Sequence, residues 1–148
     1  MEFETYDILF GKKLDSLEEE LLAYKNEQDI WKLHGDITNT PANLAMHLCG
    51  NLKHFFGMIL GNTGYKRNRD YEFTGKDLSR DEIIKEIEST KEAIMPVLKS
   101  LSLDDLNKKY PTDDFGENLT VGWIITGLGY HLGYHLGQIN YHRRMFSY

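Results

Sequence analysis

The sequence predicts an all-α protein, a four-helix bundle with long connections between its helices. Three of the four long segments place apolar residues at three- and four-residue spacing, which is the pattern of an amphipathic helix. Two of them also begin with a helix-start signal. No segment alternates apolar and polar residues between turn signals, as a half-buried strand would. The length of 148 residues fits a single bundle domain spanning residues 1–148.

The first two helices are predicted over residues 3–27 and 41–60. The first carries apolar residues on one face: Phe3, Tyr6, Phe10, Leu14, Leu17, Leu21 and Tyr24. The second begins at Thr40-Pro41, a capping hydroxyl before a proline at the first helical position, and ends at Gly61-Asn62. Residues 28–39 between them read as a structured connector.

The second half of the chain is expected to start with a long loop over residues 61–78. Ser79 and Glu82 form a capping box that opens a third helix to about Leu101, and Pro96 should kink or break its last turns. Ser102 and the residues after it cap a short turn, and the last helix is expected over residues 120–146. The two long connectors allow a crossover topology in place of a simple up-and-down one.

Composition and charge exclude several classes of protein. The net charge of −6 argues against nucleic-acid binding, which needs a basic surface for the phosphates. No apolar run reaches the 18 residues or more of a membrane span. The N-terminal residues lack the pattern of a signal peptide, and the single cysteine, Cys49, precludes an internal disulfide. We therefore expect a cytoplasmic protein with neither nucleic-acid nor membrane partners.

The last helix carries a pair of candidate metal ligands. His131 and His135 lie four residues apart, so that both imidazoles project from one face and can bind one ion. Gln138 and His142 continue the same stripe. A satisfied or exposed histidine pair is the alternative, but the apolar neighbours of this pair favour a buried site, where an imidazole needs partners.

The second helix supplies the candidate third ligand. His47, Asn51, His54 and Met58 fall within one narrow arc of an α-helix. If this arc faces His131 and His135, three imidazoles would leave open positions on a divalent cation, as catalytic sites do. Zinc and nickel both suit imidazole, and the sequence does not choose between them. The last helix also lacks the glutamate that follows the first histidine in zinc metalloproteases, which argues against that activity.

Three stretches of the chain resemble the DinB/YfiT-like family of metal-dependent proteins. They are Asn43–Leu48 with Gly50-Asn51-Leu52, Gly64–Arg69 with Glu72-Phe73, and His131–Arg144, and together with the intervening residues they extend the resemblance over nearly the whole chain. The segment His135-Leu136-Gly137-Gln138-Ile139 is its most specific part. The resemblance implies a four-helix bundle that holds a divalent metal through one histidine of the second helix and two of the last.

By position, the ligands that this resemblance implies are His47, His131 and His135. Asn51, His54, Gln138 and His142 would then surround the metal or line the rim of its pocket. The better understood members of the family are thiol S-transferases, or isomerases, that use a low-molecular-weight thiol such as bacillithiol or mycothiol. Many are homodimers. We therefore expect a metal-dependent thiol S-transferase acting on small electrophiles; the alternative is a non-catalytic metal- or ligand-binding protein of the stress response. A metal-dependent hydrolase ranks third, because no carboxylate base is visible among the ligand motifs.

Three further features have two interpretations each. Arg67, Arg69 and Arg143 could bind the carboxylates of a thiol cofactor at the pocket rim, or could be ordinary solvated charges. Gly129, Gly133 and Gly137 on the last helix favour close approach of a neighbouring helix in the bundle, or alternatively a dimer contact. Cys49 points away from the face of His47 and is predicted to be a core residue.

Overall fold

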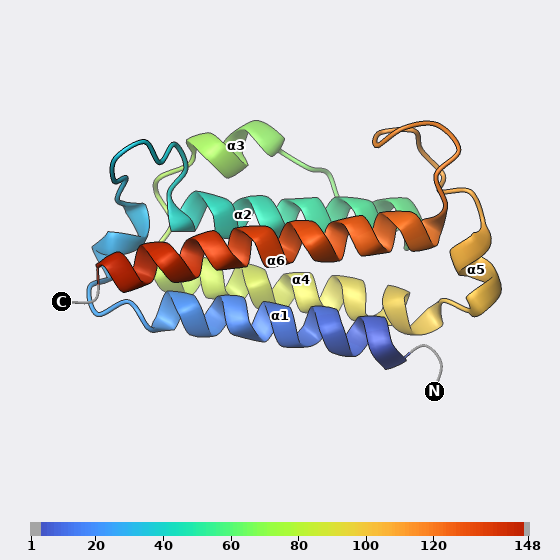
Figure 1. Cartoon of the computed structure of the whole chain (residues 1–148), viewed down its shortest axis with the longest axis horizontal. Coiled ribbons are helices and arrows are strands. Elements are labelled where there is room, and N and C mark those ends of the chain that lie inside the picture. Colours follow the sequence, from blue (N-terminus) through green and yellow to red (C-terminus); the bar gives the residue numbers. More distant parts are fainter. Residues whose placement is uncertain (1–3, 147–148) are drawn as a thin grey trace.

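The computed structural model describes residues 4–146 and shows an all-α fold with four long helical segments packed together (Figure 1). These are α1 (Glu4–Leu22), α2 (Pro41–Leu52) continued by the π-helix η2 (Lys53–Leu60), α4 (Arg80–Ser100) and α6 (Val121–Met145). The short elements are the 3₁₀-helix η1 (Glu27–Trp31), α3 (Arg69–Thr74) and α5 (Leu103–Asn107). The predicted helical bundle is confirmed. Phe3, which the sequence assigned to the first helix, lies outside the described residues.

The helix starts follow the predicted capping signals. The Thr40 hydroxyl accepts a hydrogen bond from the Asn43 N–H, with Pro41 as the first helical residue. Ser79 and Glu82 form the reciprocal capping box of α4. Local side-chain chemistry therefore determines where these helices begin.

The connection between α2 and α4 runs back along the bundle. Both helices point in the same direction, opposite to α1 and α6, so residues 61–79 must return from one end of the bundle to the other (Figure 1). The prediction of a loop over this segment was wrong for residues 69–74, which form α3 and pack on α2. Six residues are too few for a periodic pattern, and the start of α3 is stabilised by Asn68, which accepts from the Tyr71 N–H.

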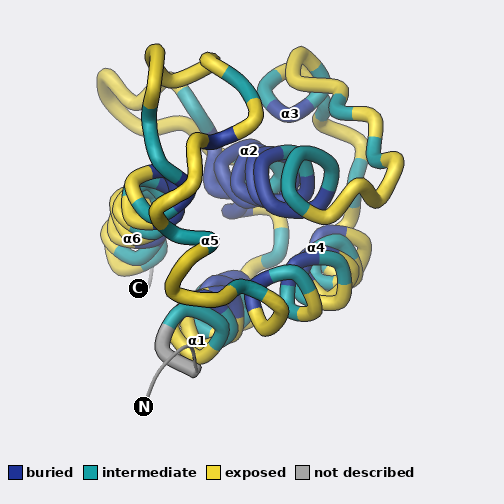
Figure 2. Tube along the Cα trace, turned by 90° about the vertical axis from the view of Figure 1, so that its right-hand side faces the viewer, coloured by how far each residue is buried: buried dark blue, intermediate teal, exposed yellow. Residues whose placement is uncertain are grey.

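The core lies between α1, α2, α4 and α6, and α2 is its most enclosed helix. Every residue of α2 except Met46 is buried, because the bundle covers one side and α3 the other (Figure 2). Polar residues on this helix are therefore shielded from bulk water, and each of them needs a partner. The crossover thus encloses His47.

Two positions in the long helices concern helix regularity, the end of the second helix and Pro96 in α4. Residues 41–60 are helical as predicted, but beyond Leu52 the helix has the wider π geometry, which shifts later side chains away from the α-helical arc of His47. Pro96 was predicted to kink or break the last turns of this helix, and the break is wrong because α4 continues to Ser100. Pro96 and Glu92, whose carbonyl loses its helical partner, both lie on the exposed face, where water replaces the missing bond.

Among the described residues, no helix combines the length and hydrophobicity that a membrane span requires.

Candidate metal centre

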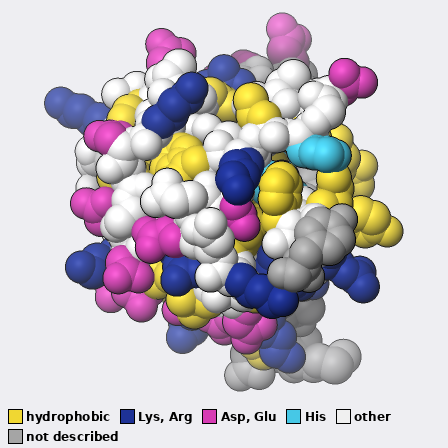
Figure 3. Space-filling view, turned by 90° about the vertical axis from the view of Figure 1, so that its left-hand side faces the viewer, with side chains coloured by type: hydrophobic (Ala, Val, Ile, Leu, Met, Phe, Trp, Pro, Cys, Tyr) yellow, Lys and Arg dark blue, Asp and Glu magenta, His cyan; other side chains and the backbone are white. Residues whose placement is uncertain are grey.

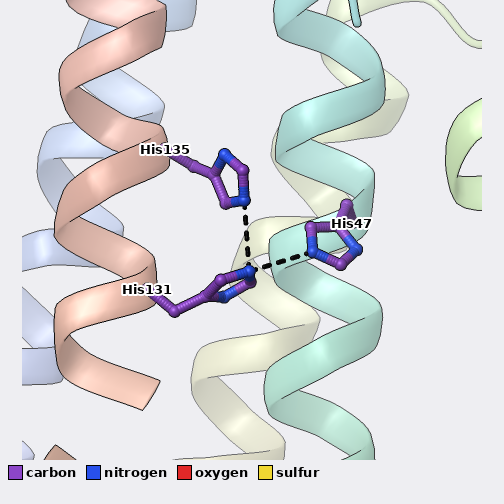
Figure 4. A group of neighbouring side chains, drawn as sticks. All are labelled: His47, His131 and His135. Carbon is purple, nitrogen blue, oxygen red and sulfur yellow. Dashed lines mark hydrogen bonds between the residues drawn. The ribbon is translucent and has the colours of Figure 1, made fainter. Parts of the chain in front are cut away.

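Three histidines from two neighbouring helices converge on one point. His47 lies on α2, and His131 and His135 lie one turn apart on the antiparallel helix α6 (Figure 4). The Nε2 atom of His131 is 3.1 Å from the Nε2 of His47 and 3.1 Å from the Nε2 of His135. Ligand atoms of all three residues lie within 4.8 Å of one another. The structure therefore brings together the three residues that the sequence indicated as ligands.

The outer nitrogens of two of these rings are held by oxygen atoms. His47 Nδ1 lies 2.9 Å from Glu72 Oε1, and His135 Nδ1 lies 2.7 Å from Gln138 Oε1. A carboxylate or amide oxygen accepts a hydrogen bond, so both Nδ1 atoms carry the proton and donate it. The Nε2 atoms of His47 and His135 consequently present their lone pairs to the space between the rings.

This arrangement has more acceptors than donors at its centre. His131 Nε2 can donate its single proton to only one of the two neighbouring lone pairs, which leaves the other facing a ring nitrogen. A cation accepts the lone pairs of all three Nε2 atoms at once. A tetrahedral zinc ion with Zn–N bonds of about 2.0–2.1 Å holds its ligand atoms about 3.3–3.4 Å apart. The observed separations of 3.1 Å are close to this, so the residues present fit a divalent metal.

The protonation of the rings also favours a cation. Burial lowers the pKa of His131 to about 4, with further contributions from His135, His47 and Arg67. Burial also lowers the pKa of His135, and the Gln138 hydrogen bond opposes this only in part. Both rings are therefore neutral near pH 7, the state in which imidazole binds metals.

Glu72 and Arg67 form a clamp behind His47. Glu72 is 3% exposed, and Arg67 donates from Nε to its Oε2 at 2.8 Å and from a terminal nitrogen to its Oε1 at 2.7 Å. Burial alone would raise the pKa of Glu72, but the hydrogen bonds from Arg67 and His47 outweigh it and the net pKa is lowered. Glu72 is therefore an anion at neutral pH and fixes the orientation of a ligand.

Gly50 provides the space that this clamp occupies. A Cβ atom at Gly50 would lie 1.9 Å from Glu72 Oε2, which is far inside contact distance. Sequence reasoning did not assign a role to Glu72, although it belongs to one of the stretches that carry the family resemblance. The contact between Gly50 and Glu72 joins residues 22 positions apart through the α3 crossover, and the short-range spacing of residues in the sequence does not indicate such a contact.

Two predicted neighbours on the second helix do not hydrogen-bond to the three histidines. Asn51 is buried, and its Oδ1 has no hydrogen-bond partner among the described residues. His54 lies on the π-helix, where its ring packs against Phe55 and burial lowers its pKa. His54 lies seven residues beyond His47, a rise of about 10 Å along the helix, which is too far for its ring to reach the three histidines.

His142 belongs to a different environment from the other α6 histidines. It is buried, with Nδ1 2.8 Å from the Tyr24 hydroxyl and Nε2 2.8 Å from the Lys32 carbonyl oxygen. Both ring nitrogens are engaged within the protein, so His142 joins α6 to the segments on either side of η1. Of the two residues that the sequence placed beyond His135 on the stripe, only Gln138 contacts a histidine of the centre.

The predicted basic rim is largely occupied by the chain's own carboxylates. Arg67 pairs with Glu72, and Arg143 pairs with Glu20. Arg69 lies over the ring of Phe73, 5.2 Å from its centroid. Cys49 is fully buried and burial raises its pKa to about 12, which confirms its prediction as a core residue.

Comparison with known proteins places the chain in a family. Residues 6–148 match the family model described as "Protein of unknown function (DUF1572)". The comparisons with curated proteins and with solved structures found no match. The DUF1572 family lies in the DinB/YfiT-like superfamily, which is the relationship that the sequence motifs indicated. The chain therefore belongs to the DUF1572 family of proteins of unknown function within that superfamily.

Proposed function

We propose that this protein holds a divalent cation, zinc or nickel, through His47, His131 and His135, and that it is a thiol S-transferase acting on small electrophiles. The convergence of three Nε2 atoms supports this proposal most strongly. Three neutral nitrogen ligands leave room for one more ligand, which is typical of a catalytic site. A bound cation supplies Lewis acidity and stabilises the thiolate form of a coordinated thiol.

The chain's own residues favour a nucleophile that comes from outside. Cys49 is the only cysteine, and its thiol is enclosed in the core with a pKa raised to about 12. Both oxygens of Glu72 accept hydrogen bonds from Arg67 and its pKa is lowered, so Glu72 is a poor base for activating water. These two facts support a thiol cosubstrate over hydrolysis. Conjugation to a halide forms a carbon–sulfur bond, breaks the carbon–halogen bond and releases the halide ion and the thiol proton, whereas conjugation to an epoxide forms a carbon–sulfur bond, breaks a ring carbon–oxygen bond and leaves the proton on the new hydroxyl.

The alternative is a non-catalytic protein that binds a metal or a small ligand in a stress response. Turnover separates the two. Tag-free protein loaded with zinc or nickel is incubated with a panel of low-molecular-weight thiols and a chlorinated or epoxide electrophile, and the thioether is measured by mass spectrometry. The transferase proposal expects conjugation that disappears in metal-free protein and in His47→Ala. Metal-loaded protein without conjugation for any thiol would favour the alternative.

Metal content tests the first half of the proposal by itself. We expect about one zinc or nickel ion per chain, as the ligand set implies, and loss of that ion in both His47→Ala and His135→Ala. His34→Ala is the matched control, because His34 is an exposed histidine outside the cluster. A protein that stays empty when offered zinc, nickel and manganese would refute the metal site.

We also propose that the protein forms a homodimer through the outer face of α6. Trp123 is 53% exposed and Tyr130 is 77% exposed on this face, and large exposed aromatic residues are typical of interfaces. A Cβ at Gly133 or Gly137 would meet no atom within 4 Å, so packing of a neighbouring helix inside the bundle does not explain these glycines. Sedimentation tests the proposal: Gly133→Leu with Tyr130→Glu should give monomers where the unmodified chain gives dimers.

A further inference from the structure

A cleft of about 680 Å³ lies beside the metal centre. Residues 36–41 and the start of α2 form one wall, and the second half of α6 forms the other. His135 and Gln138 belong both to this cleft and to the centre, so a molecule in the cleft lies next to the ligand set. The volume is within the range of small-molecule sites, about 300–1,000 Å³. The lining residues are Asp36, Ile37, Thr38, Asn39, Pro41, Leu44, Tyr134, His135, Gln138, Tyr141, His142 and Met145.

The lining carries one acidic group and no basic one. Asp36 is the only carboxylate, and no Lys or Arg lines the cleft among the described residues. Lys32, which precedes this loop, pairs with Asp29 instead, and Arg143 on the next turn of α6 pairs with Glu20. In the metal-free protein an anionic ligand would therefore enter without a Lys or Arg counter-charge and beside Asp36, which disfavours its transfer from water.

Most polar groups on the α6 side of the cleft already have partners. The Gln138 oxygen accepts from His135, and both nitrogens of His142 are engaged by Tyr24 and Lys32, so the Gln138 amide nitrogen remains as a donor for a ligand. The other free polar side chains lie mainly on the outer loop. The inner surface offered to a ligand is thus mostly apolar or aromatic.

Apolar side chains and two tyrosine rings shape the remaining surface. Leu44 is only 5% exposed, Ile37 and Met145 reach the surface, and Tyr134 and Tyr141 are 55% and 71% exposed. Tyrosine rings offer flat faces that stack on planar ligand groups. The end view in Figure 3 shows hydrophobic side chains reaching the surface beside a histidine, with charged groups spread over the rest of that face.

We propose that this cleft binds the electrophile, and that the electrophile is an uncharged molecule with a flat apolar group. The inference rests on the proposed function for the role of the ligand as electrophile. Binding in the cleft requires no metal, and it is measured separately from metal content and from turnover. In the metal-free protein, selectivity against anions follows from the absence of Lys and Arg from the lining.

The experiment compares two probes of the same shape, naphthalene-2-methanol and 2-naphthoate. Each is titrated into the full-length protein, with and without zinc, while the backbone amide signals of residues 36–39 and 134–145 are followed by nuclear magnetic resonance. In the zinc-free protein we expect the alcohol to bind at least about tenfold more tightly than the carboxylate, since an unpaired charge is costly to desolvate. The shifted signals should include the cleft residues.

Three variants locate the binding. Tyr141→Ala should lower the affinity for the alcohol by about threefold or more, because a ring contact is lost. Asp36→Asn should raise the affinity for the carboxylate by about twofold and leave the affinity for the alcohol unchanged, since Asp36 is exposed and its charge is screened. Leu103→Ala removes an exposed apolar side chain of α5 that does not line the cleft, and it should change neither affinity.

Each outcome has one consequence. In the zinc-free protein, equal or tighter binding of 2-naphthoate, or equal affinities in Tyr141→Ala and the unmodified chain, would overturn the inference even if the protein binds metal and turnover occurs in separate assays. Selective binding of the alcohol in a protein that takes up no metal would support the cleft and refute the proposed metal function. Selective binding in a metal-loaded protein that conjugates uncharged aromatic electrophiles supports both.

Discussion

His135 and His142 lie on one helix, seven residues apart, yet their surroundings give them opposite properties. The Nδ1 of His135 is held by Gln138. Its Nε2 faces two other imidazoles, and hydrogen bonds cannot satisfy the three Nε2 atoms at the same time. Both nitrogens of His142 have a partner inside the protein, Tyr24 or Lys32. Spacing places a histidine on a helix face, but the partners of its two nitrogens decide whether a lone pair remains for a cation.

The same contrast applies to the two clamps that involve carboxylates. Glu72 orients His47 and is itself held by Arg67, so its charge acts on the centre. Glu20 pairs with Arg143 and hydrogen-bonds to Asn140, which links α1 to α6. The Glu72–Arg67 pair therefore orients a residue of the candidate site, and the Glu20–Arg143 pair holds two helices together. The predictions below test this division from the largest expected effect to the smallest.

The largest effect is expected for His131→Ala against His142→Ala in a zinc titration. His131 occupies the middle of the cluster, so its removal leaves only two ligands and binding should fall below detection. His142→Ala should keep the zinc affinity of the unmodified chain. If both variants lose zinc equally, the proposed difference between the two histidines is wrong.

The metal-free protein should lose stability in acid. The pKa of His131 is about 4 in the folded chain and about 6.5 when unfolded, so the unfolded state takes up the proton first. Stability is therefore fully present above pH 6.5 and is lost as the pH falls towards 4, by up to about 3 kcal/mol. Urea unfolding at a series of pH values measures this loss. It should be smaller in His131→Gln, and a flat profile would contradict the account.

Glu72→Gln should weaken zinc binding by about 10- to 100-fold, which is typical when the partner of a metal-bound histidine is changed. The variant keeps the size of the side chain but removes the charge that favours the Nδ1–H form of His47. Gly50→Ala should act in the same direction, because its Cβ displaces the carboxylate. Gly127→Ala is the control, since its Cβ would lie 3.8 Å from the nearest atom, an ordinary contact. Zinc affinity unchanged in both test variants would show that Glu72 does not support metal binding.

The smallest effect concerns His142 itself. His142→Ala leaves the Tyr24 hydroxyl and the Lys32 carbonyl without their partner, which should lower the free energy of unfolding by about 1–3 kcal/mol. Denaturant unfolding measures it, with His34→Ala as the exposed-histidine control. A stability equal to that of the unmodified chain would show that these two hydrogen bonds contribute nothing.

The sequence alone determined the four long helices, most of their ends and the identity of the three converging histidines. Apolar spacing and capping residues act over a few positions, so Thr40, Pro41 and Ser79 predict helix starts wherever the rest of the chain lies. The pairing of His131 with His135 is equally local. His47 could be added because a bundle directs the inner faces of its helices at one another.

Only the tertiary structure decided what surrounds those histidines. Glu72 reaches His47 because α2 and α4 run in the same direction and the returning segment lays α3 on Gly50, a contact between distant parts of the chain. His54 packs against Phe55, and His142 is engaged by Tyr24, 118 residues away. Hydrogen-bond partners depend on packing between helices, which short-range spacing does not encode.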